Sequence, residues 1–478
     1  MDNGMTTEYL TPVRICSASR NVSFAEALLT ARDRQIGLKE SEYCYVSGKG
    51  HITFDFGKEY SGGARILTFI ASAPTVPVRL RFGESLSEAN AELGDRGACN
   101  DHSLRDFTTA LTSYSDMTFG ETGFRFLRID FLSDAAVSIK NIYCAFNHRI
   151  FPAETPFDAG DDRINEIFYT AKRTIDLCCR EYLWDGIKRD RLVWIGDTHP
   201  EMLALASLYG RCETIERSLD FAAAQAPYGE WANGMPMYSA WWLMIAADYA
   251  ELTGAFDYAA RNINYIKGLI SQFNEHIKEN GELNLPSYFV DWPTHEQPDE
   301  LAGCRAILIC MANAAERLLS FLGEDIAEVG ILREKLFKMP IEVKTAKQVI
   351  ALKYLALGSL SDEEKAKLTE GGAKGMSAFM SYYILKAVAE TVSAEAAVDM
   401  MRAYYGAMLD KGATTFFEDF DMEWAENSSR VDTLPENGER DIHGDFGKYC
   451  YIGFRHSLCH GWSSGVIKFL YEYCNKKS

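Results

Sequence analysis

Hydrophobic and polar residues alternate along much of the first third of the chain. Within residues 51–57, Ile52, Phe54 and Phe56 occupy every second position. A period of two is typical of a β-strand with one buried and one solvated face. Similar runs, separated by glycine-rich or polar breaks, cover residues 64–71, 76–82, 124–131 and 137–146. We therefore predict an antiparallel β-sandwich domain over residues 1–155.

The period changes near residue 157, and the rest of the chain follows a helical pattern. Between residues 162 and 180, hydrophobic residues recur at steps of three and four, as on the buried face of a helix. Short turns join this helix to those that follow, which is typical of antiparallel helix pairs. Further helices are predicted near residues 200–210, 212–225, 236–254, 256–278, 299–322, 324–338, 343–357, 361–370, 374–391, 394–409 and 463–475.

Three long loops between the predicted helices are rich in acidic and aromatic residues. They cover residues 227–235, 285–295 and 411–462. If the helices pair as a toroid, alternate connections emerge at the same end, and these loops line one mouth. Functional residues concentrate in loops on a rigid scaffold, so this mouth is the default place for a site. The acidic stretch 85–103, between predicted strands, is instead predicted to be a long surface loop.

Residues 184–197 bring three aspartates, three cations and two tryptophans together within fourteen residues. Two glycines interrupt the helical period there, and tryptophans lie among the acids, so a solvated helix face is a poor description. Carboxylates for proton transfer and aromatic faces for the apolar side of a sugar ring are what a carbohydrate site needs. The alternative is an Asp/Arg-rich connector between two helices. The stretch contains Trp184, Asp185, Lys188, Arg189, Asp190, Arg191, Trp194 and Asp197.

Asp190 and Glu418 form the candidate catalytic pair. Glycoside hydrolysis needs one carboxylic acid to protonate the leaving oxygen and a second carboxylate as a base or a nucleophile. Glu418 lies among aromatic residues, which can desolvate its carboxyl and tune its pKa. Nothing in the sequence alone shows that these two distant acids are close in space.

Histidines and cysteines offer other chemistry. His443, His456 and His460 lie in a segment with Cys450 and Cys459, but their spacing matches no standard metal-ligand set. Satisfied or sugar-binding histidines are the better interpretation, and we expect no metal ion.

The cysteines are scattered. The chain has 12 of them without a CxxC pair, which favours free thiols in a reducing cytoplasm over a disulfide framework. Cys178 and Cys179 lie on the hydrophobic stripe of the first predicted helix, so a core position is favoured over a nucleophilic role.

Charge and motifs exclude several classes of function. The net charge of −19 over 478 residues argues against a nucleic-acid or anionic-membrane partner, but leaves a neutral glycan open. No hydrophobic run is long enough for a transmembrane helix, and no signal peptide is visible, so we expect a cytoplasmic protein. Neither a glycine-rich phosphate loop nor an HExxH motif occurs, which argues against nucleotide enzymes and zincins.

Residues 185–197 resemble the signature of family 78 glycoside hydrolases, the α-L-rhamnosidases, in its shorter form. Further matches follow in the family's order at residues 287–293, 412–420 and 457–465. The preceding strands are also similar to the β-domain that adjoins the catalytic domain of these enzymes. The resemblance therefore covers most of the chain, and four ordered motifs are more specific than any one of them.

The resemblance implies an (α/α)6 barrel over residues 156–478 and inverting hydrolysis of terminal α-L-rhamnosides without a cofactor. By motif position, Asp190 is the general acid and Glu418 the general base. Asp291, Trp292 and Trp241 are weaker assignments than the others, because only their loop context matches. The full set implied to bind the sugar is Asp185, Arg189, Trp194, Asp197, Trp241, Asp291, Trp292 and His460.

Two departures from the family pattern affect these expectations. The family's usual general acid is Glu, whereas the carboxyl of Asp190 is retracted by about 1.5 Å, one C–C bond. The second departure is the missing C-terminal β-domain, which suggests a short oligosaccharide or small glycoside as substrate, and a homodimer that covers exposed helix faces. Two alternatives stay open: an (α/α)6 glycosidase for another deoxyhexose, a pentose or a uronide, and a catalytically inactive sugar-binding protein.

Overall fold

The alternating N-terminal region forms one antiparallel sheet in the computed structural model, which describes residues 4–449 and 451–476. The strand order is β3-β4-β9-β5-β8-β6-β7, with β1 paired to β9 and β2 to β5. The strands are β1 (Met5–Leu10), β2 (Arg14–Ala18), β3 (Val22–Ser23), β4 (Cys44–Ser47), β5 (Gly50–Ala71), β6 (Val76–Gly83), β7 (Asp106–Leu111), β8 (Ser115–Phe131) and β9 (Ala136–Arg149).

Strand β5 turns this sheet into a sandwich. The runs 51–57 and 64–71, predicted as separate strands, are one strand with register shifts against β8 between Asp55 and Tyr60 and between Gly62 and Ala64. Such irregularities bend a strand, and residues from both halves of β5, among them Ile52, Phe54 and Ile66, share one core. A Cβ on Gly62 would lie 2.1 Å from the carbonyl oxygen of Ala145, so the close approach of β9 at this bend requires glycine. The predicted antiparallel β fold is confirmed.

The prediction of a surface loop over residues 85–103 is wrong for its first part. Residues Leu86–Asn90 form helix α1, and Ser85 and Glu88 are buried. The amide of Leu86 donates to the carbonyl of Val431 at 2.8 Å, so α1 is inserted against the helical part of the chain. Composition indicated a solvated loop because the groups that face these acids come from segments remote in the sequence.

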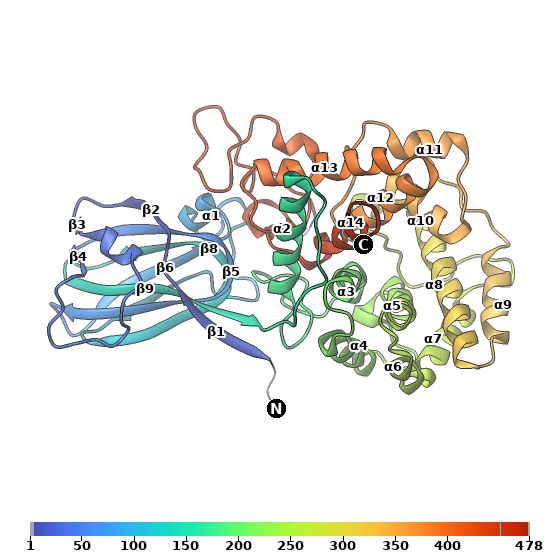
Figure 1. Ribbon diagram of the computed structural model, residues 1–478, viewed down its shortest axis with the longest axis horizontal. Helices are drawn as coiled ribbons and strands as arrows, with labels where there is room; N and C mark the ends of the chain where they lie inside the picture. Colours follow the sequence, from blue (N-terminus) through green and yellow to red (C-terminus); the bar gives the residue numbers. More distant parts are fainter. Residues whose placement is uncertain (1–3, 450, 477–478) are drawn as a thin grey trace.

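Thirteen helices of the described chain follow the sheet, close to the predicted positions (Figure 1). The predicted helix 256–278 is divided at Asn262, and the predicted helix 374–391 begins at Ser381. The helices are α2 (Asp162–Cys178), α3 (Ile195–Tyr209), α4 (Glu213–Gln225), α5 (Pro236–Thr253), α6 (Phe256–Arg261), α7 (Ile263–His276), α8 (Glu300–Leu322), α9 (Ala327–Leu336), α10 (Lys347–Leu357), α11 (Asp362–Thr369), α12 (Ser381–Thr391), α13 (Ala394–Asp410) and α14 (Val466–Tyr473).

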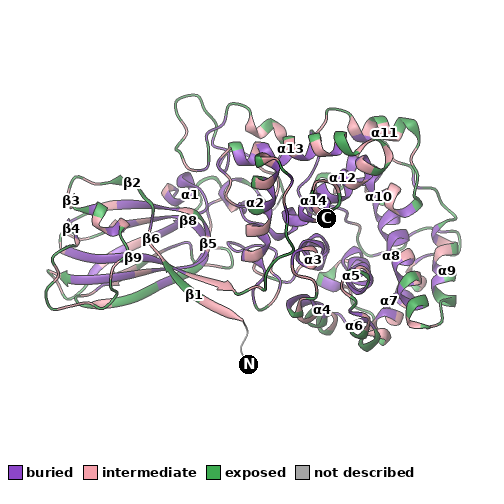
Figure 2. Ribbon diagram, in the orientation of Figure 1, coloured by how far each residue is buried: buried purple, intermediate pink, exposed green. Residues whose placement is uncertain are grey.

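Alternate helices close into a ring. Within the described residues, α3, α5, α8, α10, α12 and α14 contact one another in that order, and α14 returns to contact α3. Helices α2, α4, α7, α9, α11 and α13 pack outside this ring. The inner helix α5 is buried along nearly its whole length, whereas the outer helix α2 buries one stripe, a contrast visible in Figure 2. The predicted (α/α)6 barrel is confirmed.

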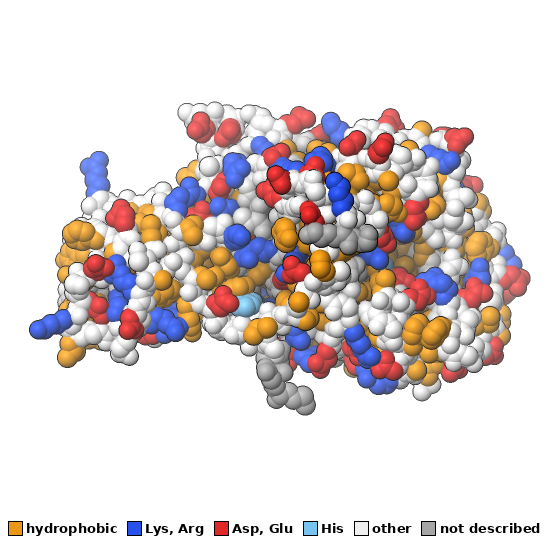
Figure 3. Space-filling model, in the orientation of Figure 1, with side chains coloured by type: hydrophobic (Ala, Val, Ile, Leu, Met, Phe, Trp, Pro, Cys, Tyr) orange, Lys and Arg blue, Asp and Glu red, His pale blue; other side chains and the backbone are white. Residues whose placement is uncertain are grey.

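The two parts of the chain meet between β9 and α2. The sheet ends at Arg149 and the first barrel helix begins at Asp162, so the predicted division at 155 falls in the connection and stays a prediction. On the face shown in Figure 3, acidic and basic side chains are interspersed over both parts.

The described cysteines are free thiols, and Cys178 and Cys179 are buried, as predicted for core positions, whereas Cys450 lies outside the described residues. Among residues 4–449 and 451–476, no helix is both long and apolar enough to cross a membrane.

Candidate active site

A cavity of about 380 Å³ opens where the N-terminal ends of α3 and α5 meet the long loops of the barrel. All three loops that were rich in acids and aromatics contribute to its wall, together with residues 185–197. The prediction that they line one mouth is therefore confirmed. The lining residues are Asp185, Arg189, Asp190, Trp194, Asp197, Asn233, Met235, Tyr238, Ser287, Tyr288, Phe289, Trp292, His295, Glu418, His460 and Trp462.

The loop between α2 and α3 carries Asp190 in an unusual backbone conformation. Asp190 and Arg191 have φ angles of 54° and 57°, in the left-handed region that costs non-glycine residues about 1 kcal/mol or more each. Asp185 closes the loop, because its Oδ1 accepts from the amide of Leu192 at 2.9 Å and its own amide donates to the Leu192 carbonyl at 3.1 Å. The strain is thus localised at the residue predicted to be the general acid.

Glu418 is buried and paired with Arg189. Its Oε1 accepts a hydrogen bond from Nη2 of Arg189, and its Oε2 accepts from the amide of Ser457 at 3.1 Å. Burial alone would raise the pKa of Glu418, but the positive charge of Arg189, with smaller effects of His460 and His456, lowers it to about 2. Burial lowers the pKa of His460 to about 4, so this ring is neutral near pH 7, and Arg189 has the largest effect in keeping Glu418 ionised.

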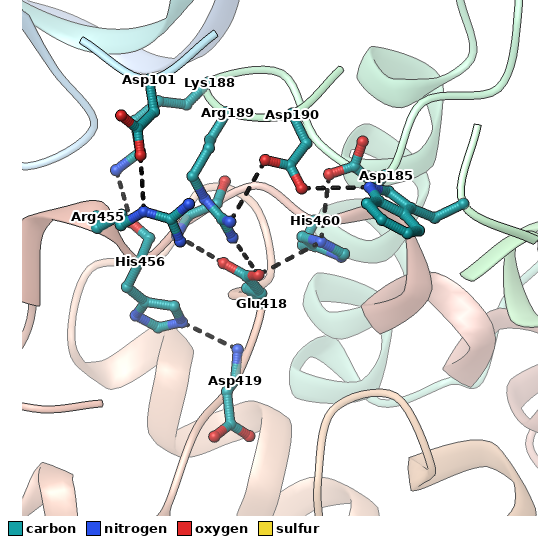
Figure 4. Close-up of polar contacts among 12 residues, drawn as sticks. Asp101, Asp185, Lys188, Arg189, Asp190, Glu418, Asp419, Arg455, His456 and His460 are labelled. Atoms are coloured by element: carbon teal, nitrogen blue, oxygen red, sulfur yellow. Dashed lines mark hydrogen bonds and ion pairs between the residues drawn. The ribbon is translucent and has the colours of Figure 1, made fainter. Parts of the chain in front are cut away.

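Asp190 has a more open environment. Its side chain is 17% exposed, against 4% for Glu418. Trp194 donates from Nε1 to Oδ2 of Asp190 at 3.2 Å, and Nη1 of Arg189 lies 3.5 Å from Oδ1. The same guanidinium therefore contacts both candidate catalytic carboxyls (Figure 4).

His460 lies at the centre of the acidic cluster. Its Nε2 is 3.8 Å from the nearest carboxylate oxygen of each of Asp185, Asp197 and Glu418. Burial, followed by the nearby acids, raises the pKa of both Asp185 and Asp197 well above its usual range. A protonated carboxyl can donate as well as accept a hydrogen bond, which suits the hydroxyl groups of a sugar.

Trp292 forms part of an aromatic wall. It lines the cavity and stacks on Tyr449, with ring centroids 5.5 Å apart. Phe289 packs edge-on against it at 5.2 Å. Trp194 and Trp462 add further aromatic faces to the same cavity.

The structure does not bring Trp241 and Asp291 to the cavity surface. Trp241 is fully buried inside the barrel against His199 and Tyr383. The Asp291 carboxylate caps the short turn Trp292–Thr294 and accepts a hydrogen bond from Ser377 at 2.7 Å. Their side chains are satisfied within the protein, so the assignment of these two residues to direct sugar contact is not supported by their positions.

Several residues of the site were not predicted. Tyr238 lines the cavity, and its hydroxyl lies 3.5 Å from Oδ1 of Asp197. Glu201, one turn further along α3, is buried beneath the acids, and burial followed by Asp197 raises its pKa well above the usual range. Helical spacing from Asp197 was a signal for Glu201. His102, from the sheet domain, contacts Asp190 at 2.7 Å, and its sequence carries no signal for this contact.

One cluster among the described residues has the geometry of a metal site. The ligand atoms of Glu84, Glu88 and His443 lie within 4.8 Å of one another. The ammonium of Lys188 is 3.0 Å from Glu84 and 3.3 Å from Glu88, and it also donates to the carbonyl of His456 at 2.6 Å. A protein cation thus already lies beside both acids of this cluster, which joins the sheet domain to the loop that carries Asp190.

Neither a family model nor the sequence of a curated protein matches this chain. Solved structures do match. The rhamnosidase from Klebsiella oxytoca with rhamnose bound is 18% identical, with a TM-score of 0.76 over 98% of this chain and 96% of that one. The family 78 rhamnosidase of Bacillus sp. GL1 is 20% identical, with a TM-score of 0.72 over 93% of this chain and 48% of that one.

The α-L-rhamnosidase of Streptomyces avermitilis, complexed with L-rhamnose, is 14% identical, with a TM-score of 0.68 over 98% of this chain and 44% of that one. The chain therefore spans nearly all of the Klebsiella protein but about half of the other two. At these identities the likeness shows a shared fold: a β-domain followed by an (α/α)6 barrel.

Proposed function

We propose that this protein is a glycoside hydrolase that removes terminal α-L-rhamnose with inversion of the anomeric centre. One observation supports this proposal above the others. Asp190 and Glu418 come from distant segments, yet both contact the guanidinium of Arg189 in a cavity with aromatic walls. Two carboxyls in unequal environments are what acid and base roles require.

In the proposed reaction, Asp190 donates its proton to the glycosidic oxygen as the C1–O bond breaks. Glu418 accepts a proton from a water molecule whose oxygen bonds to C1 from the opposite face. Glu418 suits the base role, because Arg189 keeps it ionised near neutral pH. The cycle ends when Glu418 loses its proton to solvent and Asp190 regains one. Inversion requires carboxyl groups about 6.5–9.5 Å apart, with room for that water.

Rhamnose is favoured over a uronide by the charges of the cavity. Among the described residues that line it, Arg189 is the one Arg or Lys, and it is engaged by Glu418. A uronate carboxylate would therefore lack a basic partner, whereas the aromatic and Met235 surfaces suit the C6 methyl of a deoxysugar. The rhamnose complexes of the similar structures support the same choice.

A panel of p-nitrophenyl glycosides tests the proposal. We expect turnover of the α-L-rhamnoside and much slower turnover of fucoside, arabinoside and glucuronide. Faster turnover of another glycoside would identify that sugar, in place of rhamnose, as the preferred substrate. Saturable rhamnose binding without turnover of any glycoside would contradict the enzyme and favour the sugar-binding alternative.

Other sequence predictions remain part of this proposal. We propose a short oligosaccharide or small glycoside as substrate, a cytoplasmic location and a homodimer. The free thiols of the described cysteines support a reducing compartment. Size-exclusion chromatography with light scattering distinguishes the dimer from the monomer.

A further inference from the structure

His102 reaches the candidate general acid from the other domain. It lies between α1 and β7, and its Nδ1 is 2.7 Å from Oδ1 of Asp190. The backbone amide of Asp190 also donates toward the same nitrogen, at 2.8 Å. His102 is not among the residues that line the cavity, so it acts on a substrate only through Asp190.

This contact is one of several by which the sheet domain holds the backbone of the loop between α2 and α3, which carries Asp190. Nη2 of Arg191 donates to the carbonyl of His102 at 2.7 Å, and the hydroxyl of Ser103 donates to the carbonyl of Lys188 at 2.8 Å. The loop is thus held from the sheet domain on both sides of Asp190. His102 itself has a φ of 62°, so left-handed residues face each other across this contact. Strain of this kind persists where surrounding contacts over-determine it, and it clusters at functional sites.

A single ring nitrogen serves two partners on Asp190. Nδ1 either carries a hydrogen, which it donates to the carboxylate, or carries a lone pair, which accepts from the amide or from a protonated carboxyl. The ring restrains the carboxyl oxygen when Nδ1 donates to it or accepts from its protonated form, and it restrains the Asp190 backbone when Nδ1 accepts from the amide. Trp194 holds the other oxygen, so both oxygens of this short side chain are restrained.

We propose that His102 is a positioning residue for general acid catalysis, by which the β-domain orients the carboxyl of Asp190 toward the leaving oxygen. This rests on the proposed glycosidase function, with Asp190 as the acid. The shorter reach of Asp makes orientation more demanding, and a misplacement of 1 Å can cost about 10²-fold in rate.

Dependence on the leaving group tests this role. A substrate with a good leaving group, such as 2,4-dinitrophenyl α-L-rhamnoside, needs little proton donation, whereas an alkyl or disaccharide rhamnoside needs it fully. For His102→Ala we expect kcat/KM to fall about 10- to 100-fold on the poor leaving group and less than about threefold on dinitrophenyl. The ratio of the two rates in one sample is insensitive to the fraction of folded protein.

Two variants complete the experiment. His102→Asn keeps a hydrogen-bonding atom near the position of Nδ1 and tolerates a left-handed φ, so it should restore most of the ratio. His51→Ala changes a histidine of the same domain that bonds Ser17 and Ser19, and should leave the ratio unchanged.

Equal losses on both substrates in His102→Ala would overturn the positioning role and leave the glycosidase intact. Failure of the wild type to hydrolyse either rhamnoside would overturn both proposals. Loss of the poor-leaving-group rate in His102→Ala, with rescue by Asn, supports the positioning role.

Discussion

The two candidate catalytic carboxyls differ in what holds them. Glu418 belongs to the barrel, where burial, the Ser457 amide and the Arg189 charge fix both its place and its ionisation. Asp190 lies on a strained loop at the contact between the two domains and is held by His102 and Trp194. Glu418 therefore takes these hydrogen bonds from residues of the barrel, whereas Asp190 also contacts a side chain of the β-domain directly. In the proposed mechanism, the His102 contact gives the β-domain a part in orienting the acid.

Removing the base should have the largest effect. Glu418→Gln should lower kcat by about 10³-fold for good and poor leaving groups alike, because activation of water is needed for both. Steady-state kinetics on both substrates measure this. Glu423→Gln, in a mostly exposed turn, is the matched control. A loss confined to the poor leaving group would mean that Glu418 acts as the acid.

Removal of the Lys188 ammonium, the cation between the domains, should have the next largest effect. Lys188→Met leaves the buried Glu84 and Glu88 without their ammonium and should lower the free energy of unfolding by about 3 kcal/mol. Denaturant unfolding measures this change. Lys374→Met, whose exposed side chain lies 3.7 Å from Glu423, should change stability by less than about 1 kcal/mol. Equal stability of the two variants would show that the Lys188 contacts add no net stability to the protein.

Arg189→Met tests whether the positive charge of Arg189 keeps Glu418 ionised. Glu418 must be ionised to accept a proton, and Arg189 lowers its pKa to about 2 against the effect of burial. Without this cation, burial raises the pKa, so the acid limb of the kcat/KM profile moves to higher pH. We expect the loss to be about tenfold greater at about pH 5 than at about pH 8. A variant profile parallel to that of the wild type would contradict this role of Arg189.

The smallest expected effect concerns the aromatic wall. Trp292→Ala should raise KM about tenfold with little change in kcat, because a lost stacking face is worth about 1–1.5 kcal/mol in both ground and transition states. Initial-rate kinetics separate the two constants, and Tyr228→Ala, an exposed tyrosine outside the cavity lining, is the control. A fall in kcat at constant KM would place Trp292 among the groups that act in the transition state.

Periodicity predicted most of the fold. Alternation identified the sheet, and the three-to-four spacing identified the helices, because both patterns report one buried face. The buried first part of the stretch 85–103 was missed, since Glu88 looks solvent-exposed until Lys188 is brought beside it. The union of two predicted strands into β5 also depends on partners, since its bend is defined by the register with β8.

The site was predictable where chemistry is concentrated in sequence. Residues 185–197 and Glu418 stood out by composition and motif, and the structure brings them into one cavity. Trp241 was assigned to the site from its loop context, but helix α5 directs it into the barrel core. The contact of His102 with Asp190 could not be predicted from the sequence. A lone histidine in a polar stretch belongs to no motif, and the contact exists only because the two domains pack together.

The stereochemistry of the first product tests the central claim most directly. Proton NMR of an aryl α-L-rhamnoside, followed from the start of hydrolysis by this protein, distinguishes the two anomers before they equilibrate. An acid at Asp190 and a base at Glu418 that activates water predict β-L-rhamnose as the first product. Initial release of α-L-rhamnose would show retention and contradict the assignment of Glu418 as a base.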